Sequence, residues 1–317
     1  MNKVLVTGAA GFIGFSICNK LLEFGIDVCG LDNLNNYYDP RLKSARLEIL
    51  TKKGMPFSKI DLADAEKVKK VFNSYKPTHV INLAAQAGVR YSIENPRNYL
   101  DNNIVGFFNI LELCKEFNIK HLVYASTSSV YGDSNKFPLS ENLNTDKPLS
   151  FYAATKKCNE IMAFNYANLY KFQATGLRFF TVYGPFGRPD MALFKFVNSI
   201  INNKKIDLYN YGNHYRDFTY VDDVVDAISE VVFKKRKEYH EIYNVGNGKP
   251  KSLKEYLLYI EKYLNIKAKT RKLKKQVGDV EKNHASLKKI KSFITYKPKT
   301  DIKDGIYNFI DWFKKYK

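Results

Sequence analysis

The chain has no apolar run long enough to span a bilayer, and this argues against an integral membrane protein. Its first residues run directly into the apolar segment Val4–Val6, without the charged region, apolar stretch and cleavage site of a signal peptide, so we expect no secretory leader. The four cysteines are scattered and lack paired spacing. We therefore expect reduced thiols in a cytoplasmic protein, with no disulfide framework and no metal site. They are Cys18, Cys29, Cys114 and Cys158.

Acidic residues are scarce: 32 Asp and Glu stand against 51 Lys and Arg, for a formal charge of +19. Nucleic-acid binding would favour clustered basic residues, but these are spread through the chain, with the densest runs at 234–237 and 267–275. We therefore expect no nucleic-acid partner, although anionic small ligands would benefit locally. With 317 residues and 45% hydrophobic content, the chain can form one large α/β domain or two modest ones.

A glycine-rich turn follows the first apolar segment. Lys3–Thr7 is suited to a buried parallel strand, Gly8, Gly11 and Gly14 follow at once, and helical periodicity begins near Ser16. Strand, glycine turn and helix together let a backbone approach a pyrophosphate at a helix N-terminus. The spacing G-x-x-G-x-x-G is a variant of the usual dinucleotide fingerprint.

Asp32 ends the next predicted strand, 18 residues after Gly14. There a carboxylate can accept hydrogen bonds from both ribose hydroxyls and would repel a 2′-phosphate, which favours NAD over NADP. The alternative is a cap in the Asp-Asn-Leu-Asn turn. Asp61 ends the third strand, where it can contact adenine or cap the helix that begins near Asp64.

Strand-like and helix-like segments alternate over the first 130 residues, which predicts a doubly wound parallel sheet. We expect strands at 56–60, 78–85 and 121–126, and a long helix over 98–118. The strand that ends at Ser126 runs into Thr127, Ser128 and Ser129. Such a cluster can be a simple turn, but hydroxyls at the carboxyl edge of a parallel sheet lie where ligands bind.

Tyr152 and Lys156 lie one helical turn apart, 25 residues after Thr127. In isolation, such a pair can simply be two solvent-exposed side chains on a helix surface. The charge of the lysine would favour the phenolate, so we expect the pKa of Tyr152 to fall from about 10 towards neutrality, as a proton acceptor requires.

These features together resemble the NAD-dependent nucleotide-sugar epimerase/dehydratase branch of the extended short-chain dehydrogenase/reductase superfamily. The matching motifs are the glycine turn, Asp32, Asp61-Leu62, Asn82-Leu-Ala-Ala85, Ser126-Thr-Ser and Tyr152-x-x-x-Lys156. The resemblance implies a Rossmann fold, bound NAD, Tyr152 as the catalytic base, Lys156 on the nicotinamide ribose and Thr127 on a sugar hydroxyl. Asn103, in preference to Asn102, matches an asparagine that orders the active-site backbone. The cofactor-binding residues implied are Gly8, Gly11, Phe12, Ile13, Gly14, Asp32, Asn33, Asp61, Leu62, Leu83, Ala84, Ala85, Asn103, Tyr152 and Lys156.

The chain differs from sister activities after Thr127. Dehydratases and decarboxylating synthases of this branch carry an acid shortly after that threonine, whereas Ser128 and Ser129 stand here. A 4-keto intermediate without such an acid is expected to take its hydride back, which makes epimerisation the default chemistry.

Three longer segments resemble the UDP-glucuronate 4-epimerases: 32–43, 87–92 and 178–191. A uronate carries a C6 carboxylate that a guanidinium can bind with two hydrogen bonds. Arg188 is our first candidate and Arg90 the second, and the alternative for Arg188 is a solvated loop residue. The resemblance also places Arg216 at the nucleotide diphosphate. The substrate-binding residues expected are Arg90, Thr127, Ser128, Thr181, Arg188, Arg216 and Asp279.

We expect residues 1–180 to form the NAD-binding domain, with parts of 210–245 returning to it, and residues 181–317 to form mainly a smaller α/β region for the nucleotide sugar. Asp222 and Asp223 are expected to cap a helix from Val224, and a metal site there is disfavoured because no suitably spaced ligands accompany them. The C-terminal motif departs from the family at Val277 and Ser286, which leaves the sugar open.

The leading interpretation is therefore a UDP-glucuronate 4-epimerase. Alternatives are a 4-epimerase of UDP-glucose or UDP-N-acetylglucosamine type, a 4-dehydrogenase, and a non-catalytic NAD-sensing protein, which would typically have lost Tyr152 or Lys156. The resemblance further implies a homodimer formed through helices around 98–118 and 150–170.

Overall fold

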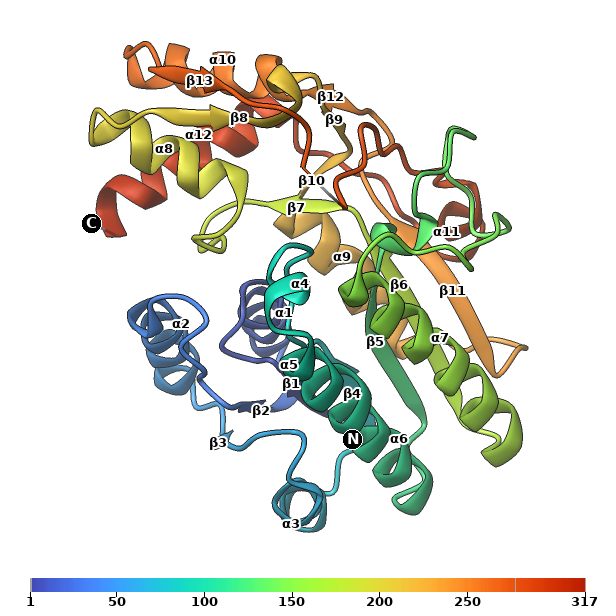
Figure 1. Ribbon diagram of the computed structural model, residues 1–317. Coiled ribbons are helices and arrows are strands. Elements are labelled where there is room, and N and C mark those ends of the chain that lie inside the picture. Colours follow the sequence, from blue (N-terminus) through green and yellow to red (C-terminus); the bar gives the residue numbers. More distant parts are fainter. Residues whose placement is uncertain (1, 277, 317) are drawn as a thin grey trace.

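The computed structural model describes residues 2–276 and 278–316. Val277, one of the departures noted above, lies outside the described residues. A seven-stranded sheet with the order β11-β6-β5-β4-β1-β2-β3 forms the lower part of the molecule in Figure 1. All its neighbouring pairs are parallel. Its strands are β1 (Lys3–Thr7), β2 (Asp27–Asp32), β3 (Phe57–Lys59), β4 (His79–Asn82), β5 (His121–Thr127), β6 (Gln173–Phe179) and β11 (His240–Val245).

The order of the strands reverses at β1: β2 and β3 are added on one side of it, and β4, β5 and β6 on the other. The carboxyl ends of β1 and β4 therefore frame a crevice of the kind where ligands bind in open α/β sheets. Successive side chains of a strand face opposite sides. Accordingly, Val4 and Val6 join one hydrophobic core and Leu5 joins the other. The predicted doubly wound sheet is confirmed.

Helices cover both faces. One core includes side chains of α1 (Phe12–Glu23), α2 (Pro40–Lys52), α9 (Val221–Phe233) and α11 (Lys288–Phe293). The other core includes α3 (Ala65–Tyr75), α6 (Gly106–Glu116) and α7 (Phe151–Tyr170). Short helical segments complete the connections: α4 (Tyr91–Glu94), α5 (Pro96–Tyr99), the π-helical turn η1 (Leu100–Val105) and the 3₁₀ turn η2 (Ser128–Tyr131).

A second part of the molecule, at the top of Figure 1, has its own core of aromatic and aliphatic residues. It contains α8 (Ala192–Ile201), α10 (Leu253–Leu264) and α12 (Ile302–Tyr316). Three small two-stranded sheets pair β7 (Thr181–Tyr183) with β10 (Phe218–Tyr220), β9 (Tyr215–Arg216) with β12 (Lys251–Ser252), and β8 (Ile206–Leu208) with β13 (Thr270–Lys272). The 3₁₀ turn η3 (Tyr209–Gly212) follows β8. Between these elements the chain returns to the large sheet, since α9 packs on α1 and β11 pairs with β6.

The helix expected over 98–118 is confirmed as the continuous helical stretch of α5, η1 and α6, and the π-helical turn η1 within it, where Asn103 is buried, was not predicted. One local prediction is wrong. Asp222 and Asp223 do not cap a helix from Val224, because α9 begins at Val221 and both lie in its first turn. Asp223 instead accepts hydrogen bonds from the backbone N–H groups of Lys299 and Thr300.

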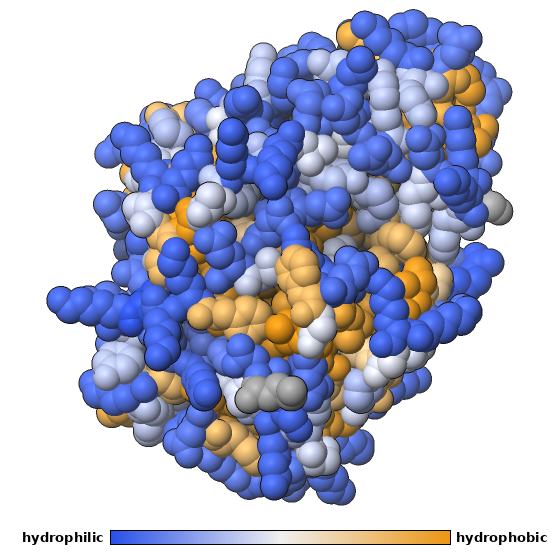
Figure 2. All heavy atoms as spheres, turned by 180° about the vertical axis from the view of Figure 1, so that it is seen from behind, coloured by the Kyte–Doolittle hydropathy of each residue, from blue (hydrophilic) through white to orange (hydrophobic). Residues whose placement is uncertain are grey.

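The surface is mostly hydrophilic when seen from behind, with apolar side chains gathered near the middle of that face (Figure 2). Among the described residues, no helix is long and apolar enough to cross a membrane.

Candidate active site

A cavity of about 850 Å³ lies between the carboxyl edge of the large sheet and the C-terminal part of the chain. Most of the predicted site residues line it. Those from the cofactor prediction are Gly8, Gly11, Phe12, Ile13, Gly14, Asp32, Asn33, Leu62, Leu83, Ala84, Ala85, Tyr152 and Lys156. Those from the substrate prediction are Arg90, Thr127, Ser128, Thr181, Arg188, Arg216 and Asp279. Asp61 and Asn103 do not line it.

The glycine turn packs too closely for side chains. Gly8 has φ +70°, and a Cβ on it would lie 2.7 Å from the backbone nitrogen of Ala84. A Cβ on Gly14 would lie 2.0 Å from the carbonyl oxygen of Gly8. Gly11 is the N-cap of α1 and makes no side-chain hydrogen bond. The helix therefore begins at the cavity wall, and its first backbone N–H groups, which have no partner within the helix, point towards the cavity. This geometry fits the pyrophosphate of a dinucleotide.

Asp32 is buried at the end of β2. Its carboxylate accepts hydrogen bonds from the backbone N–H groups of Ala10 (3.2 Å) and Leu34 (2.8 Å). The ammonium of Lys43 lies 3.7 Å away and is itself buried. Asp32 therefore anchors the turn after β2 as well as facing the cavity, so the turn-capping interpretation and the ribose interpretation describe the same side chain.

Asp61 does not line the cavity but contacts a residue that does. Its Oδ2 accepts a hydrogen bond from the amide of Asn33 (2.9 Å), and its Oδ1 accepts one from the backbone of Ala63 (2.9 Å). Asp64, and not Asp61, caps α3 through the backbone N–H of Lys67. Asp61 thus orients Asn33, which lines the cavity.

Asn103 holds the loop after β4 against α7. Its amide accepts from the backbone N–H of Gln86 (2.8 Å) and donates to the carbonyl of Gln86 (3.0 Å) and to the hydroxyl of Thr155 (3.0 Å). The carbonyl of Asn103 accepts a hydrogen bond from Asn159 (2.7 Å). Asn102, the alternative, lines the cavity, and its side chain donates a hydrogen bond to the nearby carbonyl of Asn98.

Tyr152 and Lys156 lie in the first two turns of α7, whose N-cap is Ser150. The ammonium of Lys156 donates to the carbonyl of Ala125 at the end of β5 (3.0 Å). Burial lowers the pKa of Lys156 to about 8.

The expected lowering of the pKa of Tyr152 by Lys156 is not found. Burial raises the pKa of Tyr152, and this is offset in part by the hydroxyl of Thr127 and the charge of Arg188. Desolvation of the phenolate therefore outweighs the neighbouring groups of the protein.

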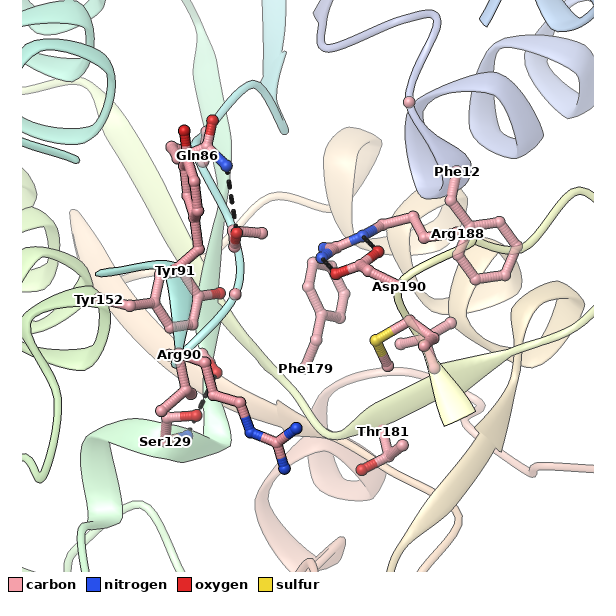
Figure 3. A pocket seen from close by; sticks show the side chains of 18 of the residues that line it. Phe12, Gln86, Arg90, Tyr91, Ser129, Tyr152, Phe179, Thr181, Arg188 and Asp190 are labelled. Atoms are coloured by element: carbon pink, nitrogen blue, oxygen red, sulfur yellow. Dashed lines mark hydrogen bonds and ion pairs between the residues drawn. The ribbon is translucent and has the colours of Figure 1, made fainter. Parts of the chain in front are cut away.

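Two arginines of the substrate prediction are each paired with a carboxylate. Arg188 binds Asp190 through Nε–Oδ1 (3.0 Å) and Nη2–Oδ2 (2.5 Å). This pair lies across the cavity from Tyr152, Tyr91 and Gln86 (Figure 3). Arg90 lies 3.3 Å from Asp279 and stacks over the ring of Tyr209, 4.5 Å from its centroid. Arg216 donates to the carbonyls of Tyr215 and Glu281, which hold it at the cavity wall.

The sequence analysis missed Glu160. It lies on the same face of α7 as Tyr152 and Lys156, at a further spacing of four residues. Its carboxylate accepts from Arg178 Nε (2.8 Å) and Nη2 (2.9 Å) and from the hydroxyl of Ser126 (2.6 Å). Arg178 and Ser126 are neighbours across β6 and β5, so one carboxylate ties α7 to both strands. The continued four-residue spacing could have revealed it.

Asp190 and a row of tyrosines were also missed. Tyr37 donates to Asp190 (3.3 Å), and its ring packs on Tyr91, at 4.9 Å between centroids. Tyr91 lies near Tyr99, and Tyr99 near Tyr152, at 6.2 and 6.1 Å. This row of rings, which we call the tyrosine row, connects the loop after β2 to α7. Sequence spacing gives no sign of it, because its members come from four separate elements.

Residues 4–246 match the family described as the NAD dependent epimerase/dehydratase family. The chain is 49% identical to Protein CapI of Staphylococcus aureus, over 99% of each chain. It is 43% identical to UDP-glucuronate 4-epimerase 4 of Arabidopsis thaliana, covering 99% of this chain and 75% of that protein.

A crystal structure of UDP-glucuronic acid 4-epimerase from Bacillus cereus, in complex with UDP-glucuronic acid and NAD, superposes with a TM-score of 0.93. The two chains are 31% identical, over 99% of this chain and 100% of that one. NAD is the cofactor that the family uses and that the glycine turn and Asp32 fit. The chain therefore belongs to the NAD-dependent epimerase/dehydratase family and is an NAD-dependent epimerase.

Proposed function

We propose that this protein interconverts UDP-glucuronate and UDP-galacturonate by inverting C4 of the sugar. The observation that carries the proposal is the position of Arg188, a guanidinium that faces Tyr152 across the cavity and influences the pKa of its phenol. A cation there suits a sugar whose C6 carboxylate lies near the reacting carbon. Residues of the large sheet would hold NAD, and the C-terminal part would hold most of the nucleotide sugar.

Gly8, Gly11 and Gly14 would receive the pyrophosphate of NAD, Asp32 the adenosine ribose and Lys156 the nicotinamide ribose. When bound, NAD supplies a hydride acceptor and a positive charge at its nicotinamide ring. In the protein without NAD, the pKa of Tyr152 is raised, and a phenol with a high pKa is a poor source of phenolate. The positive charge of the nicotinamide ring would favour the phenolate and so lower this pKa.

Tyr152 is the general base. Its oxygen accepts the proton of the sugar 4-hydroxyl as hydride leaves C4, and a 4-keto sugar results. The hydroxyl of Thr127, which lowers the pKa of Tyr152 against the effect of burial, can share the proton. After the keto sugar rotates, hydride returns to the other face of C4, and Tyr152 gives its proton back to the same oxygen. The reaction has no net oxidation.

The residues after Thr127 support return of the hydride over elimination or decarboxylation. Ser128 and Ser129 form a 3₁₀ turn that lines the cavity, and neither is an acid. The carboxylates of Asp190 and Asp279, which also line the cavity, are paired with arginines. Before the sugar binds, neither carboxylate is free beside the sugar site.

Arg216 would bind the diphosphate, and Arg90 and Asp279 would close over the nucleotide from the two parts of the molecule. Ser128 and Thr181 offer hydroxyls to the sugar. A homodimer is part of the proposal, since α6 and α7 expose apolar side chains at Phe108, Ile161, Phe164 and Leu169. So is a cytoplasmic location, which agrees with four free cysteines.

The decisive test is incubation of the purified protein with UDP-glucuronate and separation of the products by chromatography. We expect UDP-galacturonate, with the reverse reaction from that compound. Tyr152→Phe should reduce kcat roughly 10²–10⁴-fold while NAD stays bound. Conversion of UDP-galactose or UDP-N-acetylgalactosamine, without any turnover of UDP-glucuronate, would refute the uronate and retain the chemistry.

A further inference from the structure

Arg188 and Asp190 belong to the loop between β7 and α8, two residues apart, and their charged groups meet edge to edge. The side chain of Arg188 is 22% exposed and that of Asp190 is 26% exposed. Both line the cavity. The guanidinium that would receive the sugar carboxylate therefore already holds a carboxylate of the protein.

The two carboxylates would compete for the same donors. A guanidinium binds a carboxylate best through two parallel N–H···O bonds, and Asp190 occupies Nε and Nη2 of Arg188. An incoming C6 carboxylate must either displace Asp190 or approach the remaining N–H groups with a like charge beside it. In both cases Asp190 weakens the binding of an anionic sugar and leaves a neutral sugar unaffected.

Asp190 has a second hydrogen-bond partner, which it would retain if the sugar carboxylate displaced it from Arg188. The phenol of Tyr37 donates to Oδ2 of Asp190 (3.3 Å), and Tyr37 is the first member of the tyrosine row. Lys195, on the first turns of α8, also contributes positive charge that lowers the pKa of Asp190. A displaced Asp190 would therefore remain hydrogen-bonded and close to its present position.

We propose that Asp190 is a specificity-determining residue that competes with the C6 carboxylate of the sugar for Arg188. The proposal rests on the proposed function, in which Arg188 receives that carboxylate. The exchange of Asp190 and the sugar carboxylate on Arg188 would assist the reaction. The 4-keto sugar must release its contacts with the protein before it can rotate and present the other face of C4 to the hydride donor. When the sugar carboxylate leaves, Asp190 returns to Arg188, and the guanidinium is not left unpaired in a partly buried site.

The test compares, on the NAD-loaded enzyme, a nucleotide sugar whose sugar carries a carboxylate with one whose sugar is uncharged. KM and kcat are measured for UDP-glucuronate, and the inhibition constant Ki is measured for UDP-glucose as a competitor. In Asp190→Asn we expect KM for UDP-glucuronate to fall about tenfold, as removal of a like charge from a partly exposed site implies. We expect kcat to fall severalfold, because the intermediate is held too firmly, while Ki for UDP-glucose stays within about twofold.

Three further variants make the result specific. Asp190→Glu keeps the charge and should restore the wild-type ratio of KM to Ki, whereas Asp190→Ser should behave as Asp190→Asn does. Glu48→Gln removes one negative charge from an exposed ion pair with Lys52 on α2, outside the cavity. It raises the net charge equally and should leave both constants unchanged.

A rise in KM with Asp190→Asn, or equal changes in KM and Ki, would overturn the proposal and leave Asp190 as a residue that merely positions Arg188. Failure of the proposed function looks different, since the wild-type enzyme itself would then not convert UDP-glucuronate.

Discussion

Two arginine–carboxylate pairs flank the same active site and differ mainly in exposure. Arg178 and Glu160 join β6 to α7, and their side chains are 3% and 2% exposed. Arg188 and Asp190 belong to one loop and are 22% and 26% exposed. Both pairs make two N–H···O bonds. The comparison teaches that identical contact geometry can serve as a fixed structural tie in one place and as an exchangeable contact in another.

The reason is the cost of separating the charges. A fully buried guanidinium that loses its carboxylate has no water to replace it, so the pair stays closed. A pair open to the cavity can exchange one oxygen ligand for another at small cost. The predictions below test this difference from the largest expected effect to the smallest.

Glu160→Gln should produce the largest loss of stability. It removes the charge that pairs with Arg178 and leaves the guanidinium buried, and we expect the free energy of unfolding to fall by about 3–5 kcal/mol. Urea denaturation measures it. The double variant Glu160→Leu with Arg178→Met removes both charges and should recover much of the loss. A loss below about 1 kcal/mol in the single variant would show that the pair is not a structural tie.

Lys156 provides the opposite case, a buried cation that pairs with no carboxylate among the residues the structure describes. Burial lowers its pKa to about 8, and in the unfolded chain it is about 10.4. Because the folded pKa is the lower one, the unfolded state binds more protons between these values, so stability rises with pH across this window.

The cost of holding Lys156 buried is about 3 kcal/mol at pH 7 and about 2 kcal/mol at pH 9. We therefore expect the stability of Lys156→Met relative to wild type to be about 1 kcal/mol greater at pH 7 than at pH 9, in protein freed of nucleotide. Urea denaturation at the two pH values checks this. A relative stability that does not change with pH would exclude titration of Lys156 as its source.

Asp190→Asn should have a modest effect on folding even if its effect on KM is large. Asn keeps one hydrogen bond to Arg188, and water can reach the guanidinium, so we expect a loss of about 1 kcal/mol or less. Thermal unfolding followed by circular dichroism is sufficient. A loss as large as that of Glu160→Gln would remove the distinction between the two pairs.

Asp207 and Arg271 form a third pair with two bonds, on the surface, with side chains 31% and 61% exposed. Asp207→Asn should leave the unfolding midpoint indistinguishable from that of the wild type, because solvent and salt screen the pair. A clear loss there would mean that geometry, and not burial, decides the strength of these pairs.

The sequence predicts the features that depend on local patterns. The glycine turn, Asp32, Thr127 and the Tyr152–Lys156 pair all lie on one cavity, because spacing along a strand–turn–helix unit determines where such residues lie. The sheet follows from the alternation of strands and helices.

What the sequence does not predict depends on contacts between distant segments. The π-helical turn that buries Asn103 and the burial that raises the pKa of Tyr152 arise from packing. Asp190 resembles any loop acid until Arg188 and Tyr37 are placed around it. The Asp222–Asp223 prediction failed for the same reason, since the partners of Asp223 lie 76 and 77 residues away in the chain.

The return of the chain to the large sheet has a consequence for how the protein is made. Until α9 has left the ribosome, the apolar side chains of α1 that pack on it are uncovered, and until β11 follows, the strand edge of β6 is unpaired. An unpaired edge and an exposed apolar helix are liable to aggregate, so the N-terminal half cannot be a stable intermediate of synthesis. A fragment ending at Phe180 should therefore be insoluble when expressed, and cooperative folding should wait until residue 245 is available.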